Sequence, residues 1–277
     1  MFLKRNNLLL FLLLLLAGLI GLTVYFYSQP ERFTLQHISW SGPLPVDWSA
    51  VRLTEAEKKE MLTILKQPFY PLGEGHQTYA FVSKDGKTVL KFIKFSYMNS
   101  MSAVERDNRL KRLFLGYILS FQRDRDNTGL IALHQADPKG TPLTVTVDDT
   151  PLDVTPLYFI LQKRVTPLKE VLNQNKSHAK EKLDKILDLY ADEYKRGLYD
   201  SDHNVLYNTG FIGDRPYRLD AGRIKVLPAG NRSTFIKLDL EKILTRFRKW
   251  IVKNLPEKEQ APLLKHLQER IDQIALS

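Results

Sequence analysis

The stretch that decides the fold is LGEGHQTYAFVSKDGKTVLKFI, residues 72–93. Within it, residues 79–83 and 88–93 are rich in β-branched and aromatic side chains, which favour extended strands. Between these two runs stands Asp85-Gly86, a pair that is typical of a tight turn joining antiparallel strands. The sequence therefore predicts a β-hairpin here.

The second strand of this hairpin carries a lysine that has no polar face to occupy. Side chains alternate along a strand, so Val89, Lys91 and Ile93 share one face. Leu90 and Phe92 occupy the other face, which is also apolar. Lys91 therefore points into a covered region on either side of the sheet. Because a buried ammonium is costly unless it is paired, we expect Lys91 to have a charged partner.

Gly73-x-Gly75, the hairpin and the strand ending in Val89-Leu90-Lys91 resemble the N-lobe of the protein kinase-like superfamily. In that family a glycine-rich loop covers the ATP phosphates, and a strand lysine contacts the α- and β-phosphates. The resemblance implies that Gly73, Gly75 and Lys91 bind ATP. The third glycine of the family falls at Thr78 and its following valine at Ala80, so this chain keeps only part of the loop pattern.

The resemblance also implies a helix with an acidic residue that pairs with the strand lysine. Residues 102–123 have helical periodicity with one apolar face. Glu105 is the only glutamate in this segment, and it is the partner that the resemblance implies for Lys91. Asp107 lies closer to the apolar face and stays an alternative. An exposed acid among the neighbouring arginines is the other alternative.

The next segments fit the middle of the same fold. Residues 157–164 predict a buried strand that leaves into a linker at residues 165–167. In the kinase-like pattern this is the last N-lobe strand and the hinge, although a plain core strand would have the same sequence. Residues 168–172 and 181–196 then predict helices of the C-lobe.

A second group of polar residues follows these helices. Asp220-Ala221-Gly222 resembles the Asp-Phe-Gly triplet of the family, with alanine in place of phenylalanine. Gly213-Asp214-Arg215-Pro216 predicts a turn, so Asn208 and Asp220 are expected at the two open ends of one hairpin. Amide and carboxylate oxygens suit a hard cation, and the resemblance implies that Asn208 and Asp220 bind Mg²⁺.

The catalytic aspartate of the family stands five residues before its metal-binding asparagine. Asp202 precedes Asn208 by six residues and Asp200 precedes Asn204 by four, so neither pair has the family spacing. We favour Asp202 with Asn208, because a loop can absorb one extra residue by bulging. The pair Asp200 and Asn204 stays open, as does an acidic surface loop with no catalytic role.

The N-terminus carries a different signal. Residues 8–27 contain no charge and no proline, and about 20 residues at about 1.5 Å per residue cover the hydrocarbon core of a bilayer. This run predicts an uncleaved transmembrane anchor; the alternative is a signal peptide, whose apolar region would be shorter. Lys4 and Arg5 precede the run, so the positive-inside rule favours a non-cytoplasmic soluble domain.

The composition excludes several classes of protein. With 43% hydrophobic and 26% charged residues among 277, the chain is neither disordered nor a low-complexity protein. The absence of cysteine excludes disulfides, a thiolate zinc site and a cysteine nucleophile. The formal net charge of +10 suits an anionic membrane surface, but without a nucleic-acid-binding motif we expect no nucleic acid partner.

We therefore expect an α+β, two-lobed protein kinase-like domain after one N-terminal transmembrane helix. The expected parts are a tail (1–7), the anchor (8–27), a linker (28–53), an N-lobe with a small antiparallel sheet (54–165) and a mainly helical C-lobe (166–277). The resemblance implies a membrane-anchored phosphotransferase that uses ATP and Mg²⁺ on an unknown acceptor, with a protein as a further partner or as that acceptor. Its expected catalytic residues are Asp202, Lys91 and Glu105. The alternatives are a degenerate kinase-like scaffold (a pseudokinase) and a basic membrane-surface adaptor.

Overall fold

The computed structural model describes residues 15, 16, 18, 33–47, 51–75 and 77–276. The chain divides into a unit Met1–Leu35 and a compact unit Gln36–Ser277. In the described part of the chain, no helix is both long enough and apolar enough to cross a membrane. Apart from residues 15, 16 and 18, the anchor predicted at residues 8–27 lies outside the described residues, and it stays a prediction.

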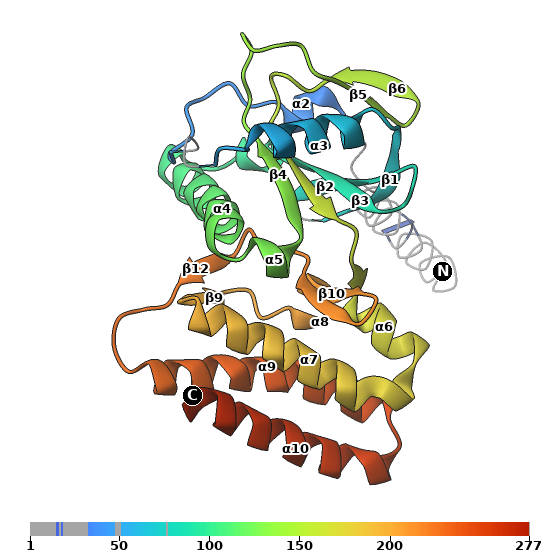
Figure 1. Ribbon diagram of the computed structural model, residues 1–277, viewed down its shortest axis with the longest axis vertical. Helices are drawn as coiled ribbons and strands as arrows, with labels where there is room; N and C mark the ends of the chain where they lie inside the picture. Colours follow the sequence, from blue (N-terminus) through green and yellow to red (C-terminus); the bar gives the residue numbers. More distant parts are fainter. Residues whose placement is uncertain (1–14, 17, 19–32, 48–50, 76, 277) are drawn as a thin grey trace, which may run out of the picture. The chain divides into compact units, whose positions relative to one another are not determined.

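The first half of the unit Gln36–Ser277 is built on a mostly antiparallel sheet (Figure 1). The order of its strands is β4-β7-β3-β2-β1-β5-β6. The predicted hairpin is confirmed, since β2 and β3 pair with Ala80 opposite Lys91. The sequence did not predict β1, which places Gly73 inside a strand and not before one. The strands are β1 (Phe69–Glu74), β2 (Thr78–Ser83), β3 (Thr88–Ile93), β4 (Leu130–His134), β5 (Thr144–Val147), β6 (Thr150–Asp153) and β7 (Phe159–Lys163).

One long helix, α4 (Ala103–Arg123), packs its apolar face onto this sheet. Ser102 caps its N-terminus, and the predicted helix at residues 102–123 is confirmed. The shorter helix α3 (Glu55–Leu65) begins at Thr54, whose capping box with Glu57 is also formed. The segment before α3 adds the short helix α2 (Leu35–Ile38) and the buried side chain of Val51 to this half of the molecule.

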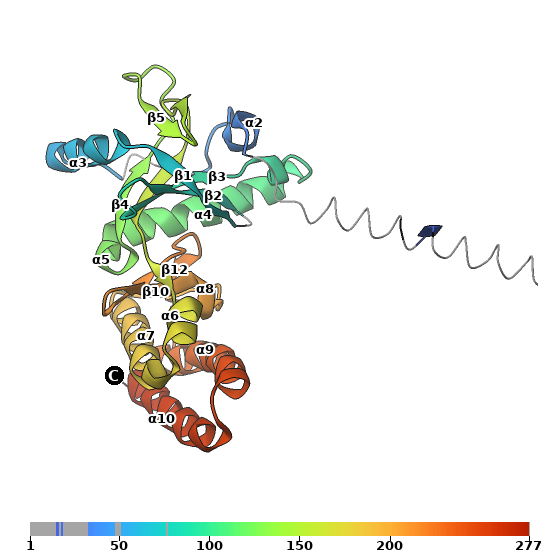
Figure 2. The same ribbon diagram turned by 90° about the vertical axis from the view of Figure 1, so that its right-hand side faces the viewer.

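After the strand β7 the chain enters a mainly helical half (Figure 2). Helix α9 packs along α10, and α10 also contacts α7, so these three helices enclose a core of leucine, isoleucine and aromatic side chains. The helices of this half are α6 (Leu168–Gln174), α7 (Ala179–Lys195), α8 (Val205–Asn208), α9 (Arg232–Asn254) and α10 (Glu257–Leu276). The short helix α5 (Arg125–Thr128) comes earlier in the chain, between α4 and β4.

Short strands bring the polar segments of this half together. The second predicted hairpin is confirmed: β10 (Thr209–Ile212) pairs with β11 (Arg215–Arg218), and β8 (Thr166–Pro167) pairs with β10. In addition, β9 (Leu198–Asp200) pairs with β12 (Ile224–Val226). A sheet with one long helix packed on it and a mainly helical half after it together make up a fold of the α+β class, with the order of elements that the sequence predicts.

Candidate functional site

A cleft of about 460 Å³ collects most of the predicted site residues. Its walls come from β2, β3 and α4 of the sheet lobe and from the loops around α8 and β11 in the helical lobe. Five predicted residues line it, whereas Gly73 and Glu105 do not. The lining residues are Gly75, Gln77, Thr78, Lys91, Tyr117, Asp202, Asn204, Tyr207, Asn208, Leu219, Asp220 and Arg223.

The glycine turn joins β1 to β2 at one wall of this cleft. The Gly75 N–H donates a hydrogen bond to the Thr78 carbonyl oxygen at 2.8 Å, which closes the turn. Chain neighbours aside, a Cβ atom built on Gly73 would meet no atom of the described residues within 4 Å, and one on Gly75 would meet only atoms of Thr78, the nearer at 3.8 Å. Packing within the protein therefore does not require these glycines. Open space beside a bare backbone suits the approach of a ligand.

Lys91 reaches into the cleft from the middle of β3. Its ammonium donates to Gln162 Oε1 at 2.6 Å and to the Leu219 carbonyl oxygen at 2.7 Å. Burial lowers the pKa of Lys91, and the nearby Asp220 carboxylate opposes that shift. The lysine of the sheet lobe and the acid of the helical lobe, far apart in sequence, thus meet at one place.

The structure corrects the predicted partner of Lys91. Glu105 is exposed on α4, where its carboxylate accepts hydrogen bonds from the Ser102 N–H at 3.1 Å and the Ser102 hydroxyl at 2.7 Å. These bonds form the capping box that begins the helix, and they lower the pKa of Glu105. The alternative acid, Asp107, is exposed as well. Neither acid contacts Lys91.

Gln162 takes that place, and sequence reasoning did not single it out. Its side chain is 2% exposed on β7, and its Nε2 donates to the carbonyl oxygens of Thr128 at 2.5 Å and Arg218 at 3.0 Å. The Gln162 amide therefore makes three hydrogen bonds: its oxygen accepts one from Lys91, and its nitrogen donates two to backbone carbonyls. It orients Lys91 without adding a charge. The available signal was an amide inside the apolar strand at residues 157–164, because a buried amide needs partners.

Asn208 and Asp220 lie side by side, as the hairpin predicts. The Leu219 N–H donates to the Asn208 carbonyl oxygen at 2.7 Å, and Asp220 Oδ1 accepts from the Gly222 N–H at 3.0 Å. The Asn208 Nδ2 atom is buried and has no hydrogen-bond partner among the described residues. No described residue therefore holds this amide in an orientation that would keep it from binding a ligand. The amide of Asn208 and the carboxylate of Asp220 suit a Mg²⁺ site in which phosphate and water supply the other ligands. Among the described residues, no group of three or more His, Asp or Glu side chains is placed to bind a metal ion.

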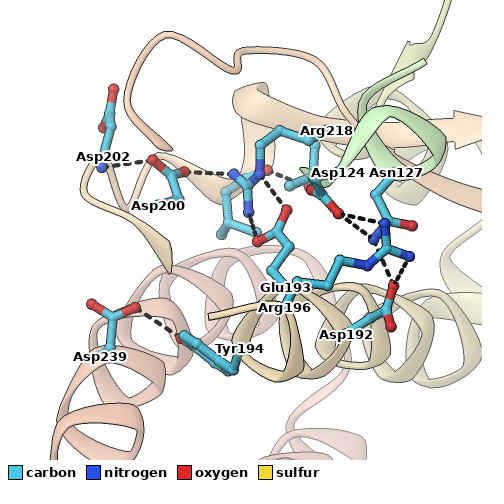
Figure 3. A network of polar contacts seen from close by, with 12 residues as sticks. Asp124, Asn127, Asp192, Glu193, Tyr194, Arg196, Asp200, Asp202, Arg218 and Asp239 are labelled. Carbon is cyan, nitrogen blue, oxygen red and sulfur yellow. Dashed lines mark hydrogen bonds and ion pairs between the residues drawn. The ribbon is translucent and has the colours of Figure 1, made fainter. Parts of the chain in front are cut away.

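The structure also separates the two candidate aspartates (Figure 3). Asp200 is fully buried, and its Oδ2 accepts from Arg218 Nη1 at 2.6 Å, so it cannot reach a substrate. Its other oxygen accepts the Asp202 N–H at 2.8 Å. Asp202 itself lines the cleft together with Asn208. The geometry therefore favours Asp202 over Asp200 as the acid that faces a ligand.

A buried ion cluster supports this loop from below (Figure 3). Arg218 is fully buried, and its Nε and Nη2 atoms each donate at 2.6 Å to one oxygen of Glu193. Although burial opposes it, the carboxylates of Glu193 and Asp200 raise the pKa of Arg218 well above its ordinary value. Because Arg218 stands two residues before Asp220, this cluster fixes both the loop with Asp202 and the strand that leads to Asp220.

His203 fixes the other side of the loop. Its Nε2 lies 2.6 Å from Asp239 Oδ1 on α9, and Asp239 Oδ2 accepts the Tyr194 hydroxyl at 2.8 Å. Burial and the neighbouring Asp239 carboxylate raise the pKa of Tyr194 well above its ordinary value. Asp200 before Asp202 and His203 after it are thus held by side chains of the helical lobe, and Asp202 between them lines the cleft.

No family model matches the chain, and no curated protein matches it. It is similar to the solved structure of WbdD, with a TM-score of 0.41 and 14% identity over 73% of this chain and 44% of that chain. A second structure of WbdD, a bifunctional kinase-methyltransferase, has a TM-score of 0.39 and 15% identity over 71% and 43%. The ROP18 kinase domain in complex with AMP-PNP and sucrose has a TM-score of 0.44 and 15% identity over 75% and 76%. The chain spans less than half of the WbdD chains.

Proposed function

We propose that this chain is a kinase-like, ATP-dependent phosphotransferase. The observation that carries the proposal is the convergence of Gly75, Lys91, Asp202, Asn208 and Asp220 on one cleft between the two lobes. These residues come from four separate segments of the sequence, and each has the chemistry that one part of a nucleotide site requires. The glycine turn and the lysine suit phosphates, the amide and carboxylate suit a metal ion, and the remaining acid suits an acceptor hydroxyl.

Each residue has a distinct role in this proposal. The third N–H donor of Lys91, beyond those bonded to Gln162 and Leu219, would bind phosphate oxygens. Asn208 and Asp220 would hold Mg²⁺, which neutralises charge on the transferred group when it is bound. Asp202 would accept a hydrogen bond from the acceptor hydroxyl and orient it for attack. Most of the rate enhancement then comes from positioning and charge stabilisation.

A second candidate function is a kinase-like scaffold that binds nucleotide without turnover. Two observations favour it over the enzyme. The partner of Lys91 is the neutral Gln162, not an acid. In addition, Asp202 stands one residue too far from Asn208 for the family spacing. Both candidate functions use the same cleft, and both include nucleotide binding. Only the enzyme would also transfer phosphate.

The test is nucleotide binding by the full chain in detergent, with and without Mg²⁺. A ligand that binds only the folded state raises its melting temperature, so a thermal shift measures occupancy. We expect ATP with Mg²⁺ to stabilise the wild type, Lys91→Ala to reduce the shift, and Asp220→Ala to remove its dependence on Mg²⁺. Lys84→Ala, in the exposed hairpin turn, is the matched control and should behave as the wild type. No shift with any nucleotide would overturn both candidates.

Turnover separates the two candidates. Asp202→Asn should bind nucleotide as the wild type does and lose phosphate transfer to water, to the chain itself or to a supplied acceptor. Phosphate release by the wild type that stops in Asp202→Asn would establish the enzyme. Nucleotide binding without any release would favour the scaffold.

We also propose that residues 8–27 anchor this domain in a membrane, with the domain on the non-cytoplasmic side. The support is the uncharged apolar run and the two basic residues, Lys4 and Arg5, that precede it. A reporter fused to the C-terminus should fractionate with membranes and be cleaved by protease added outside intact cells. A reporter that is protected from the protease would place the domain in the cytosol and contradict the proposed side. A reporter found in the soluble fraction would contradict the proposed anchor.

A further inference from the structure

A second buried lysine lies directly after β3. The Lys94 side chain is 7% exposed, and its ammonium lies 3.1 Å from Glu74 Oε2 and 4.2 Å from the centre of the Tyr79 ring. Burying an ammonium costs free energy unless it is compensated, and here a carboxylate and an aromatic face compensate it. Lys94 does not line the cleft described above. The free-energy cost of burying its ammonium therefore needs another explanation.

The partner of Lys94 belongs to the glycine turn. Glu74 stands between Gly73 and Gly75, and its side chain is 30% exposed, so its carboxylate is partly open to solvent. The backbone of Lys94 holds the same turn, because its N–H donates to the Gln77 carbonyl oxygen at 2.8 Å. Both the side chain and the backbone of Lys94 therefore fasten the turn whose Gly75 lines the cleft.

A contact from α2 supports the same corner from the other side. His37 Nδ1 lies 3.0 Å from the Tyr79 hydroxyl, and the two rings stack at 6.4 Å with an angle of 10° between their planes. The His37 carbonyl oxygen accepts the N–H of Phe95, the residue after Lys94, at 2.7 Å. Trp40 stacks on the Phe95 ring at 5.4 Å. The segment around α2 thus fixes Tyr79 and the end of β3 in place.

We propose that Lys94 is a positioning residue for the glycine turn, held in place by His37 and Tyr79. Its ammonium keeps Glu74, and with it Gly75, at the wall of the cleft. It also neutralises a carboxylate that would otherwise repel nucleotide phosphates. This inference rests on the proposed nucleotide site. It adds that the affinity for phosphates depends on a residue outside the cleft.

The first test compares two ligands on the full chain. In Lys94→Met, the dissociation constant for ATP with Mg²⁺ should rise about tenfold, because a charged hydrogen bond that orders the turn is lost. Adenosine has no phosphates, so its affinity should stay unchanged, which a general loss of structure would not allow. Lys94→Arg should restore most of the ATP affinity. Lys84→Met, an exposed lysine in the β2–β3 turn, is the control.

The second test measures the turn itself, without nucleotide. The amide of Gly75, bonded to Thr78, should exchange hydrogen faster in Lys94→Met and in Glu74→Gln, because the turn opens more often. The double variant should exchange no faster than Lys94→Met alone, since Lys94→Met already removes the contact between Lys94 and Glu74. His37→Ala should show a smaller change in the same direction.

The outcomes distinguish this inference from the proposed function. If the wild type binds ATP and Lys94→Met binds it equally well, the positioning role is overturned and the nucleotide site stands. If the wild type binds no nucleotide, the proposed function fails, and the exchange rate at Gly75 still decides whether Lys94 orders the turn. Unchanged exchange in Lys94→Met overturns the inference in either case.

Discussion

Adding one methyl group at Gly116 of α4 should disturb the metal end of the cleft, by which we mean the side where Asn208 and Asp220 are proposed to bind Mg²⁺. A Cβ atom at this position would lie 2.7 Å from the Ala221 carbonyl oxygen, 2.7 Å from the Gly222 carbonyl carbon and 2.8 Å from the Gly222 oxygen. Ordinary contact begins at 3.4 Å. All three atoms belong to the backbone, so no side chain can rotate away. In Gly116→Ala, either α4 or the segment after Asp220 must move.

Two opposing terms set the size of the effect on stability. Overpacking of this kind costs about 1–3 kcal/mol. Replacing glycine by alanine within a helix stabilises the folded state by about 1 kcal/mol, because alanine has the higher helix propensity. We therefore expect Gly116→Ala to lower the free energy of unfolding by about 1 kcal/mol, which corresponds to about 2–4 °C in melting temperature for a domain of this size. The effect on the cleft should be larger, because the displaced backbone carries Asp220.

The assay is the thermal shift produced by ATP, measured as a function of Mg²⁺ concentration. Gly116→Ala should need more Mg²⁺ for the same shift, whereas the shift without Mg²⁺ should resemble that of the wild type. Asn108→Ala is the control, since it raises helix propensity at an exposed position of the same helix. A Gly116→Ala protein that is as stable as Asn108→Ala and keeps the wild-type Mg²⁺ dependence would refute this reasoning.

Three further predictions concern the buried polar groups. Arg218→Met should lower the free energy of unfolding by about 3–5 kcal/mol in urea denaturation, because Glu193 and Asp200 stay buried without their cation; a loss below about 1 kcal/mol would contradict this. Gln162→Leu should cost about 1–3 kcal/mol and weaken ATP binding in the thermal-shift assay, since it leaves buried partners unsatisfied, and unchanged binding would contradict a role in orienting the lysine. Burial and the neighbouring Glu193 raise the pKa of Asp124 from 3.8 to about 7, so its protonated form stabilises the fold at low pH and that stability is lost as pH rises through about 7. Asp124→Asn should flatten the fall in melting temperature as pH rises from 3.8 to about 7, the two pKa values between which the unfolded chain has lost this proton and the folded chain still binds it.

The sequence predicted those elements whose signals are local. The β2–β3 hairpin follows from two strand-forming runs around Asp85-Gly86, and α4 follows from its periodic apolar face. The turn at residues 213–216 placed Asn208 next to Asp220 because a hairpin joins its own two ends. The convergence of Lys91 with Asp220 is not local. It followed from the order of the segments in a kinase-like fold, and the structure brings the two residues together.

The missed residues depend on contacts that no local pattern contains. Gln162 and Arg218 act through buried polar groups that folding brings beside them. The apolar run at residues 157–164 indicates that Gln162 is buried, but it does not indicate which groups it contacts. The misassigned Glu105 did carry a local signal. Ser102-x-x-Glu105 is a capping box before an apolar helix, the same signature as Thr54-x-x-Glu57 at the start of α3. A glutamate used by a helix cap is not available to a distant lysine.

These contacts change how α4 is connected to the cleft. In the arrangement that the resemblance implies, an acid on this helix would hold the strand lysine, so movement of the helix would act on Lys91. Here Gln162 of β7 holds Lys91, and α4 instead touches the metal end, through Gly116 against the backbone after Asp220 and through Tyr117. Burial, together with the adjacent Asp220 carboxylate, raises the pKa of Tyr117 well above its ordinary value. A displacement of α4 should therefore alter the proposed metal binding at Asp220 and leave the proposed phosphate contact of Lys91 in place.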